Sequence, residues 1–330
     1  MVSLAAAFST IDSHTAGHPT RVILSGVPAL KGNSVRARRD DFRARFDHLR
    51  SALLHEPRGH AAMVGAVQVP SEVADFGVFF ISSYVYLDMC GHGTIGFAKT
   101  LAFTGAITSE SGDTFTLETP AGVVTVGLSW ADDGTLSSVR LRNVPSYVGI
   151  DSVKVDVEDV GPVDAPIVYG GMWYALVDAD ALGLELAPAN ASSLMRAGWA
   201  IKSALSKALI GSEVIGDAAM PSVLFYSASA PDDATHFLVL ASNKFDRSPC
   251  GTGSAARMCW LLETGQLAPE KAYTARNILG IPFTLRLAGT QPVGERSASI
   301  VEIEGSAFIT STQTILFESD DPLSRGFLCN

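Results

Sequence analysis

Two stretches of nearly matching sequence decide how this chain is organised: residues 86–94, Tyr-Leu-Asp-Met-Cys-Gly-His-Gly-Thr, and residues 246–254, Asp-Arg-Ser-Pro-Cys-Gly-Thr-Gly-Ser. In both, a cysteine is followed by Gly-x-Gly-Thr/Ser and then by an apolar stretch. A Thr-Gly pair ends each apolar stretch, and its glycine lies 15 residues after the cysteine. The copies lie 160 residues apart in a chain of 330. Such a repeat predicts two related halves.

Each copy is typical of an extended segment, a glycine turn and a helix of roughly three turns. The apolar residues after each cysteine recur at i, i+3, i+4 and i+7, which is helical spacing. These inner stripes are Ile95, Ala98, Leu101 and Ala102 in the first copy, and Ala255, Met258, Cys259 and Leu262 in the second. Gly105 and Gly265 are predicted helix ends, and both Cys90 and Cys250 stand at the helix starts.

Strand patterns dominate the rest of the chain, at residues 123–128, 138–143, 236–242 and 299–304. Two amphipathic helices are predicted around residues 42–53 and 194–205. The arginines between residues 36 and 50 are interpreted as a solvated helix face in preference to an anion site. The expected fold class is therefore α+β, with two strand-rich halves, each built around a central helix.

The composition excludes several classes of protein. With 47% hydrophobic and 18% charged residues the chain is typical of a soluble globular protein, and its formal net charge of −10 argues against nucleic-acid or anionic-membrane partners. Four cysteines are too few for a disulfide scaffold. No convincing signal peptide and no apolar run of about 18 residues is found, so we expect a cytoplasmic protein with free thiols.

A cysteine at a helix start can act as an acid or a base. The first turn of a helix presents unpaired N–H groups and the positive end of the macrodipole, which favour a thiolate and can also hold a carboxylate. Two such thiols suit the removal of a proton from one face of a carbon and its return to the other. Inversion of an amino acid at Cα by this route requires no cofactor.

The same motifs have three other interpretations. Residues 91–96 match G-x-G-x-x-G, but the acids that follow, Glu110, Asp113 and Glu118, lie in turn-like sequence and the strand pattern is not that of a parallel α/β sheet, which disfavours dinucleotide binding. A hydrolase using Cys90 or Cys250 with a histidine leaves the matched second cysteine without a purpose. A metal site at Cys90, His92 and Cys250 lacks an obvious fourth ligand.

Five segments together resemble the proline racemase family, which includes 4-hydroxyproline 2-epimerases and trans-3-hydroxy-L-proline dehydratases. They are residues 12–15, Asp-Ser-His-Thr; 19–21, Pro-Thr-Arg; 56–60, Glu-Pro-Arg-Gly-His; 89–96; and 246–253. The resemblance covers nearly the whole chain. It implies a diaminopimelate-epimerase-like fold of two pseudo-symmetric lobes with the active site between them. The expected lobes are residues 1–121 with 307–330, carrying Cys90, and residues 122–306, carrying Cys250.

Carried over position by position, the resemblance implies that Cys90 and Cys250 are the acid and base. Four residues are expected to hold the substrate carboxylate through their backbone N–H groups: Gly91, His92, Gly251 and Thr252. The side chains of His92 and Asp246 would contact the ring nitrogen of an imino acid. Val64, His60 and His14 are expected to line the pocket. The family resemblance implies no cofactor and suggests a homodimer; no metal is expected, because the fourth ligand is missing.

The choice of substrate depends on a few positions. Dehydratases of the family that this chain resembles usually carry threonine at the position of Cys250. The cysteine therefore favours racemisation or epimerisation. Val64 and residues 245–248 favour 4-hydroxyproline, whereas His60 resembles the racemase or dehydratase form. We therefore expect epimerisation of trans-4-hydroxy-L-proline at C2, giving the cis-4-hydroxy-D isomer. Proline racemase, trans-3-hydroxy-L-proline dehydratase and a non-catalytic imino-acid binding protein are the alternatives.

Two residues depart from the family pattern. His18 stands where the family usually has glutamate, and Arg276 lies near another such position. Either would change the substrate preference if it lined the pocket, but neither alters the cysteine pair.

Overall fold

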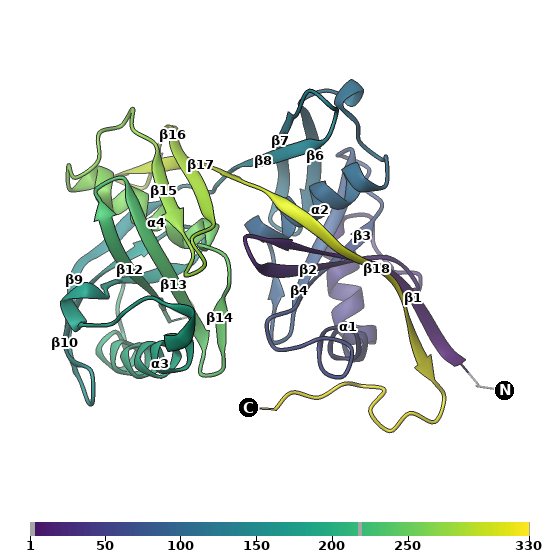
Figure 1. Cartoon of the computed structure of the whole chain (residues 1–330), viewed down its shortest axis with the longest axis horizontal. Coiled ribbons are helices and arrows are strands. Elements are labelled where there is room, and N and C mark those ends of the chain that lie inside the picture. The colour runs from purple at the N-terminus through teal and green to yellow at the C-terminus, as the bar shows by residue number, and fades with distance from the viewer. Residues whose placement is uncertain (1–3, 217–219, 330) are drawn as a thin grey trace. The chain divides into compact units, whose positions relative to one another are not determined.

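A computed structural model describes residues 4–216 and 220–329 of the chain, which forms two compact units (Figure 1). The first unit is Met1–Leu141 with Gly305–Asn330, and the second is Arg142–Glu304. The chain thus leaves the first unit 20 residues later than the expected boundary after residue 121. The reason is strand pairing: β7 (Gly122–Trp130) returns antiparallel along β6 (Thr114–Thr119), and β8 (Leu136–Arg142) then pairs with β7.

The described part of the first unit forms one mixed sheet with two α-helices and a short 3-10 helix at Ser109–Ser111. Its strands follow the order β18, β1, β2, β3, β4, β6, β7, β8, with β5 paired to β4; the pairs β2–β3 and β4–β6 are parallel and the others antiparallel. The remaining bounds are β1 (Leu4–Thr15), β2 (His18–Ser25), β3 (Val64–Val69), β4 (Phe76–Ser82), β5 (Tyr86–Leu87) and β18 (Ala307–Glu318), with α1 (Val35–Leu54) and α2 (Gly91–Phe103).

The second unit repeats this topology. Its strands follow the order β9, β10, β11, β12, β13, β15, β16, β17, with β14 paired to β13; the pairs β11–β12 and β13–β15 are parallel and the others antiparallel. The bounds are β9 (Tyr147–Val157), β10 (Gly161–Tyr169), β11 (Trp173–Asp178), β12 (Ser222–Ala230), β13 (Asp233–Ala241), β14 (Lys244–Asp246), β15 (Tyr273–Arg276), β16 (Pro282–Val293) and β17 (Arg296–Gly305), with α3 (Ala191–Ala208) and α4 (Gly251–Glu263). The sequence repeat therefore marks two units of one topology, and the α+β prediction is confirmed.

The helices that follow the two cysteines are the central helices of their units. α2 and α4 both begin one residue after the cysteine and both run for 13 residues, as predicted. Most of their side chains are buried, including Ile95 and Leu101 on α2 and Met258 on α4. Gly105 and Gly265 follow the helix ends with φ of +74° and +69°, a left-handed conformation that glycine adopts without strain.

The other two helices each pack on one face of a sheet. α1 packs against β3, β4 and β6, and its stripe of Phe42, Leu49 and Leu53 is buried. The carboxylate of Glu118, on β6, accepts a hydrogen bond from the Val35 N–H at the start of α1 (2.9 Å), which complements the positive end of the helix. α3 buries Leu194, Ile201 and Leu205 against β9, β12 and β13.

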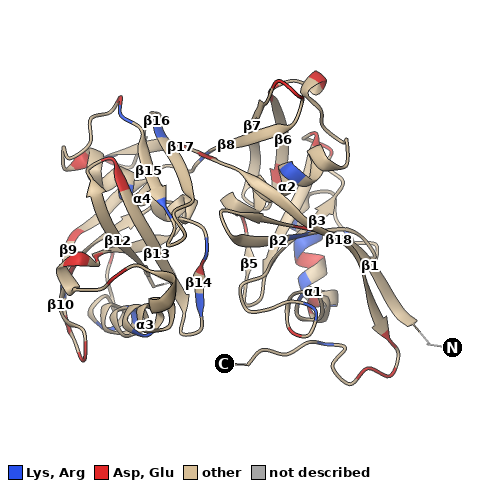
Figure 2. Ribbon diagram, viewed as in Figure 1, with Lys and Arg blue, Asp and Glu red and all other residues tan. Residues whose placement is uncertain are grey.

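The arginines of α1 are the basic cluster seen in the sequence (Figure 2). A solvated face is the right interpretation for Arg36, Arg43 and Arg45, whose side chains are exposed. It is wrong for Arg39, which is 8% exposed and bonded to Asp88 at 2.6 Å. A cleft of about 670 Å³ is lined by Arg39, Arg43 and Arg50 of this helix, and by none of the expected site residues.

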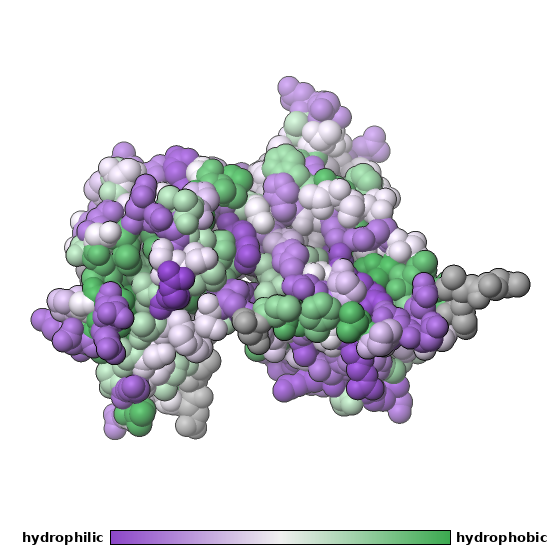
Figure 3. All heavy atoms as spheres, turned by 60° about the horizontal axis from the view of Figure 1, so that its bottom comes forward, coloured by the Kyte–Doolittle hydropathy of each residue, from purple (hydrophilic) through white to green (hydrophobic). Residues whose placement is uncertain are grey.

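Hydrophilic and apolar residues alternate over the face of the molecule in Figure 3, with apolar side chains exposed in small groups. Within the described ranges, no helix has the length and apolar character needed to cross a membrane.

Candidate active site

Cys90 caps the start of α2 in the first unit. It is 7% exposed, its backbone is extended at φ −147°, and its carbonyl accepts the Thr94 N–H at 2.9 Å. Its Sγ lies 3.5 Å from Nδ1 and 3.8 Å from Nε2 of His92, the second residue of the helix. The structure therefore brings together the expected acid–base residue and the expected ring-nitrogen ligand.

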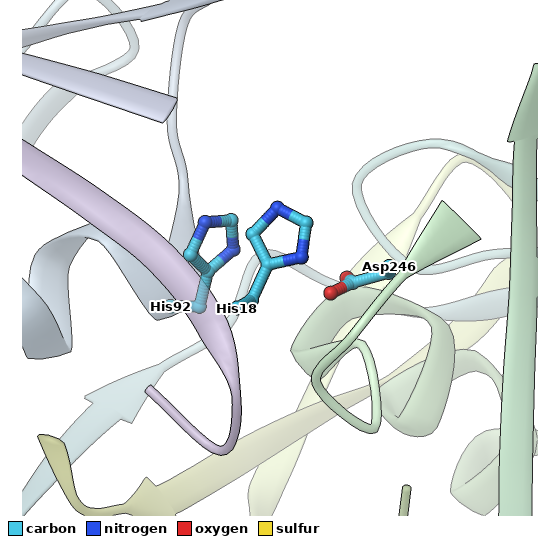
Figure 4. A group of neighbouring side chains, drawn as sticks. All are labelled: His18, His92 and Asp246. Atoms are coloured by element: carbon cyan, nitrogen blue, oxygen red, sulfur yellow. The ribbon is translucent and has the colours of Figure 1, made fainter. Parts of the chain in front are cut away.

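His18 lies against His92. Their ring centroids are 4.3 Å apart with an interplanar angle of 66°, so the two imidazoles meet edge to face (Figure 4). His18 is 1% exposed at the start of β2, and Thr15 at the end of β1 donates its hydroxyl to the His92 carbonyl at 2.9 Å. The unusual histidine of the sequence is thus a close neighbour of the Cys90 motif.

The three expected pocket residues occupy different environments in the first unit. Val64 begins β3 and is 2% exposed. His60 is exposed in the turn before β3, where its Nδ1 accepts the Ala62 N–H at 3.3 Å. His14, on β1, accepts the Gly17 N–H at 3.2 Å, and its ring lies tilted by 31° against that of Phe308, with the centroids 5.5 Å apart. Their expected role as pocket lining stays a prediction.

Cys250 caps α4 in the second unit in the same way, but in a left-handed conformation with φ of +64° and ψ of +99°. It is 4% exposed, and its Sγ accepts the Gly253 N–H at 3.3 Å. Asp246, at the end of β14, accepts both the N–H and the hydroxyl of Ser248 at 2.8 Å. The Ser248 hydroxyl accepts the Cys250 N–H at 3.1 Å, so the Asp246 carboxylate is connected to the backbone of Cys250.

A buried polar cluster supports the segment just before Cys250. His236 on β13 is 1% exposed; its Nδ1 lies 3.2 Å from the Pro249 carbonyl and 3.1 Å from the Ser254 hydroxyl. Its Nε2 lies 2.7 Å from the Tyr273 hydroxyl. Neither His236 nor Tyr273 carries a local sequence signal, because both lie in ordinary strands and meet α4 only in the folded unit.

The expectation that a helix start lowers the pKa of the thiol is wrong for Cys250. Burial and the neighbouring Asp246 charge raise its pKa to about 12, and outweigh the lowering effects of the Gly253 N–H and of the Tyr174 and Thr252 hydroxyls. The helix terminus favours charge at this position, but the loss of hydration is the larger effect. Both the burial and the Asp246 charge thus favour the protonated thiol of Cys250.

Two further predictions are refined by the structure. Arg276 forms an ion pair with Asp233 (2.8 Å) between β15 and β13, so its charge is already paired. The first sheet has one parallel pair joined through α2, β4–β6, but it is mixed and mostly antiparallel, so it is not the parallel α/β sheet of a dinucleotide site. Glu118 lies on β6 and not in a turn, and its carboxylate accepts hydrogen bonds from the Val35 N–H and the Ser71 hydroxyl.

Comparison with known proteins places this chain in a family. The proline racemase family model matches residues 10–328. A 4-hydroxyproline 2-epimerase of Streptosporangium roseum is 37% identical over 97% of this chain and 98% of its own length. The proline racemase of Clostridioides difficile is 33% identical over 96% of this chain and 97% of its own.

A solved structure has the same fold across the whole chain. The hydroxyproline epimerase of Agrobacterium vitis, crystallised with bound trans-4-hydroxy-L-proline, aligns with a TM-score of 0.87 and 28% identity over 100% of this chain and 96% of that one. The fold is that of the diaminopimelate epimerases, and the protein is an isomerase of the racemase and epimerase class. Within that class, the chain belongs to the proline racemase family.

Proposed function

We propose that this protein epimerises trans-4-hydroxy-L-proline at C2 to cis-4-hydroxy-D-proline, with Cys90 and Cys250 as its acid and base and without a cofactor. The observation that carries the proposal is the matched placement of the two thiols. Each caps the central helix of its unit, at equivalent positions of one repeated topology. A duplicated fold that keeps a thiol at the same place in both copies is suited to a symmetric proton transfer.

The proposed reaction uses one thiolate and one thiol. The thiolate takes the Cα proton from one face of the substrate, and the thiol donates its proton to the opposite face of the resulting carbanion. The products are the inverted substrate and an enzyme whose two sulfurs have exchanged protonation states. Burial and the Asp246 charge, which raise the pKa of Cys250, favour this residue as the thiol partner.

The backbone at the helix starts supports binding of the substrate carboxylate. The N–H groups in the first turn of a helix have no partner within the helix, and the helix dipole favours an anion there. Gly91 and His92 provide such groups on α2, and Gly251 and Thr252 on α4. His92 and Asp246 would contact the ring nitrogen, the carboxylate balancing its positive charge.

The relatives favour 4-hydroxyproline over proline. Three relatives named 4-hydroxyproline 2-epimerase are 37–39% identical to this chain, and three named proline racemase are 31–33% identical. Proline racemase activity is the second candidate. Cys250 argues against a dehydratase, which needs one base only to remove the Cα proton before loss of the hydroxyl.

The proposal is tested by proton NMR of trans-4-hydroxy-L-proline with the enzyme and a reductant in D₂O. We expect loss of the Cα proton signal together with appearance of the cis isomer. L-Proline and trans-3-hydroxy-L-proline are run in parallel. Turnover of proline alone would make the protein a racemase, and a cyclic imine trapped by a carbonyl reagent would make it a dehydratase.

The mechanism is tested by serine substitutions. Cys90→Ser and Cys250→Ser are each expected to abolish net epimerisation, while Cys329→Ser, which changes an exposed thiol, is the matched control. Net epimerisation that survives in either of the first two variants contradicts the two-thiol mechanism. Binding of the imino acid without Cα exchange in the unmodified protein would show a binding protein instead.

A further inference from the structure

Two hydroxyl groups lie against the sulfur of Cys250. The Tyr174 hydroxyl is 3.7 Å and the Thr252 hydroxyl 3.8 Å from Sγ, and these hydroxyls are 2.6 Å from each other. All three residues belong to the second unit. Tyr174 is 1% exposed, so water cannot replace the hydrogen bonds of its hydroxyl.

The local backbone is built to hold this arrangement. Tyr174 is the second residue of β11, and the turn that connects β10 to β11 contains Gly170 and Gly171. A Cβ on Gly170 would lie 2.3 Å from the Thr252 carbonyl oxygen, so glycine is needed for this turn to approach the first turn of α4. The turn and β11 together place the tyrosine hydroxyl beside both Thr252 and Cys250.

The first unit has no such hydroxyl chain among its described residues. The sheet register places Thr20 at the position of Tyr174, because Thr20 pairs with Val64 in β2–β3 as Tyr174 pairs with Ser222 in β11–β12. The side chain of Thr20 is much shorter, and its buried hydroxyl has no hydrogen-bond partner there. The sulfur of Cys90 lies instead beside the His92 imidazole, so the two thiols differ in their hydrogen-bond partners.

We propose that Tyr174 and Thr252 form a reversible hydroxyl chain that stabilises Cys250 in both of its protonation states. When Cys250 is a thiol, S–H donates to Tyr174, whose hydroxyl donates to Thr252. When Cys250 is a thiolate, both hydroxyls rotate: Thr252 donates to Tyr174, and Tyr174 donates to the sulfur. No proton leaves either hydroxyl, and each keeps its hydrogen bond to the other.

The chain matters most for the thiolate. Hydrogen bonds to ionised groups are about twice as strong as those between neutral groups, and a thiol is a weak donor. Burial and the Asp246 charge oppose the Cys250 thiolate, so a hydroxyl donor within the same buried cluster offsets part of that cost. This role rests on the proposed function, in which Cys250 must act as a base in one direction of the reaction.

The test is the variant Tyr174→Phe, which removes one oxygen and keeps the buried ring. Alkylation of Cys250 by iodoacetamide is followed by mass spectrometry of its peptide at several pH values, without substrate. Loss of one charge-assisted hydrogen bond is expected to raise the apparent pKa of Cys250 by about one unit, so that alkylation slows about tenfold at a fixed pH below it. Thr252→Val is expected to slow alkylation in the same direction.

The matched control is Tyr226→Phe. Tyr226 lies on the neighbouring strand β12 against Arg257, and among the described residues its hydroxyl has no recorded hydrogen bond. Cys90 in the same samples is the internal reference. If Tyr174 served packing alone, Tyr174→Phe would loosen the packing around Cys250, and alkylation of Cys250 would be as fast as in the unmodified protein or faster. That result overturns the proposal.

Activity gives a second readout. For an active enzyme, Tyr174→Phe should lower kcat with KM nearly unchanged, and an unchanged kcat contradicts the proposal. If the unmodified protein epimerises nothing, the proposed function fails, while the alkylation result still decides whether the hydroxyl chain exists.

Discussion

His236 should make the second unit sensitive to acid. It is completely buried, and burial together with the neighbouring Arg257 guanidinium lowers its pKa from 6.5 to about 3, against a smaller raising effect of the Pro249 carbonyl. Its Nε2 faces the Tyr273 hydroxyl, and its Nδ1 faces the Ser254 hydroxyl as well as Pro249. In the folded protein the imidazole therefore stays neutral between about pH 6.5 and pH 3, a pH range in which the same histidine of the unfolded chain is protonated.

The sign follows from proton linkage. Below pH 6.5 the unfolded chain binds a proton at this histidine and the folded chain does not, so the free energy of unfolding falls as the pH falls, until the folded pKa near 3 is reached. At 1.36 kcal/mol per pKa unit, the loss between pH 7 and pH 4 is about 3 kcal/mol. In His236→Asn this contribution should disappear, although the variant starts from a lower stability at pH 7.

The assay is urea unfolding at pH 7 and pH 4, followed by tryptophan fluorescence. Trp173, Trp199 and Trp260 belong to the second unit and only Trp130 to the first, so the signal reports mainly on the unit that contains His236. The control is His48→Asn, which changes an exposed histidine on α1. If wild type and His236→Asn lose the same free energy of unfolding between the two pH values, the reasoning is refuted.

Three other changes test the structural arguments. Arg21→Ala breaks a buried pair in which Arg21 binds both oxygens of Asp12 at 2.9 and 2.8 Å, and should cost about 3–5 kcal/mol of the unfolding free energy in urea. Gly170→Ala forces a Cβ against the Thr252 carbonyl, and should lower kcat in the epimerase assay much more than it lowers the melting temperature. Glu118→Gln removes the charge at the start of α1 and should cost about 0.3–2 kcal/mol by the same urea assay; no measurable loss would show that this charge contributes nothing.

The architecture was largely predictable from local patterns. The spacing of apolar residues and the Thr-Gly pairs predicted α2 and α4 with their starts and ends, because helix periodicity and left-handed glycines are properties of a few neighbouring residues. The repeat predicted two units of one topology. The domain boundary was harder to place, because only strand pairing shows that β7 and β8 belong with β6.

The surroundings of Cys250 were less predictable. The sequence identified the thiol and, by family resemblance, Asp246 and Thr252. It did not identify Tyr174, which lies 76 residues before Cys250 in an apolar strand, or His236 and Tyr273, which meet across 37 residues of chain. No pattern of neighbouring residues links such pairs, because only the folded sheet brings their strands to one place.

By itself, the sequence determined the duplicated fold, the family, and the two cysteines at helix starts. The tertiary structure decided what those positions mean electrostatically. A helix start alone favours a thiolate, yet Cys250 has a raised pKa because packing removes water from its sulfur and places the Asp246 charge nearby. Hydration and distance between charges arise from packing across the whole unit, so they cannot be read from the residues next to the cysteine.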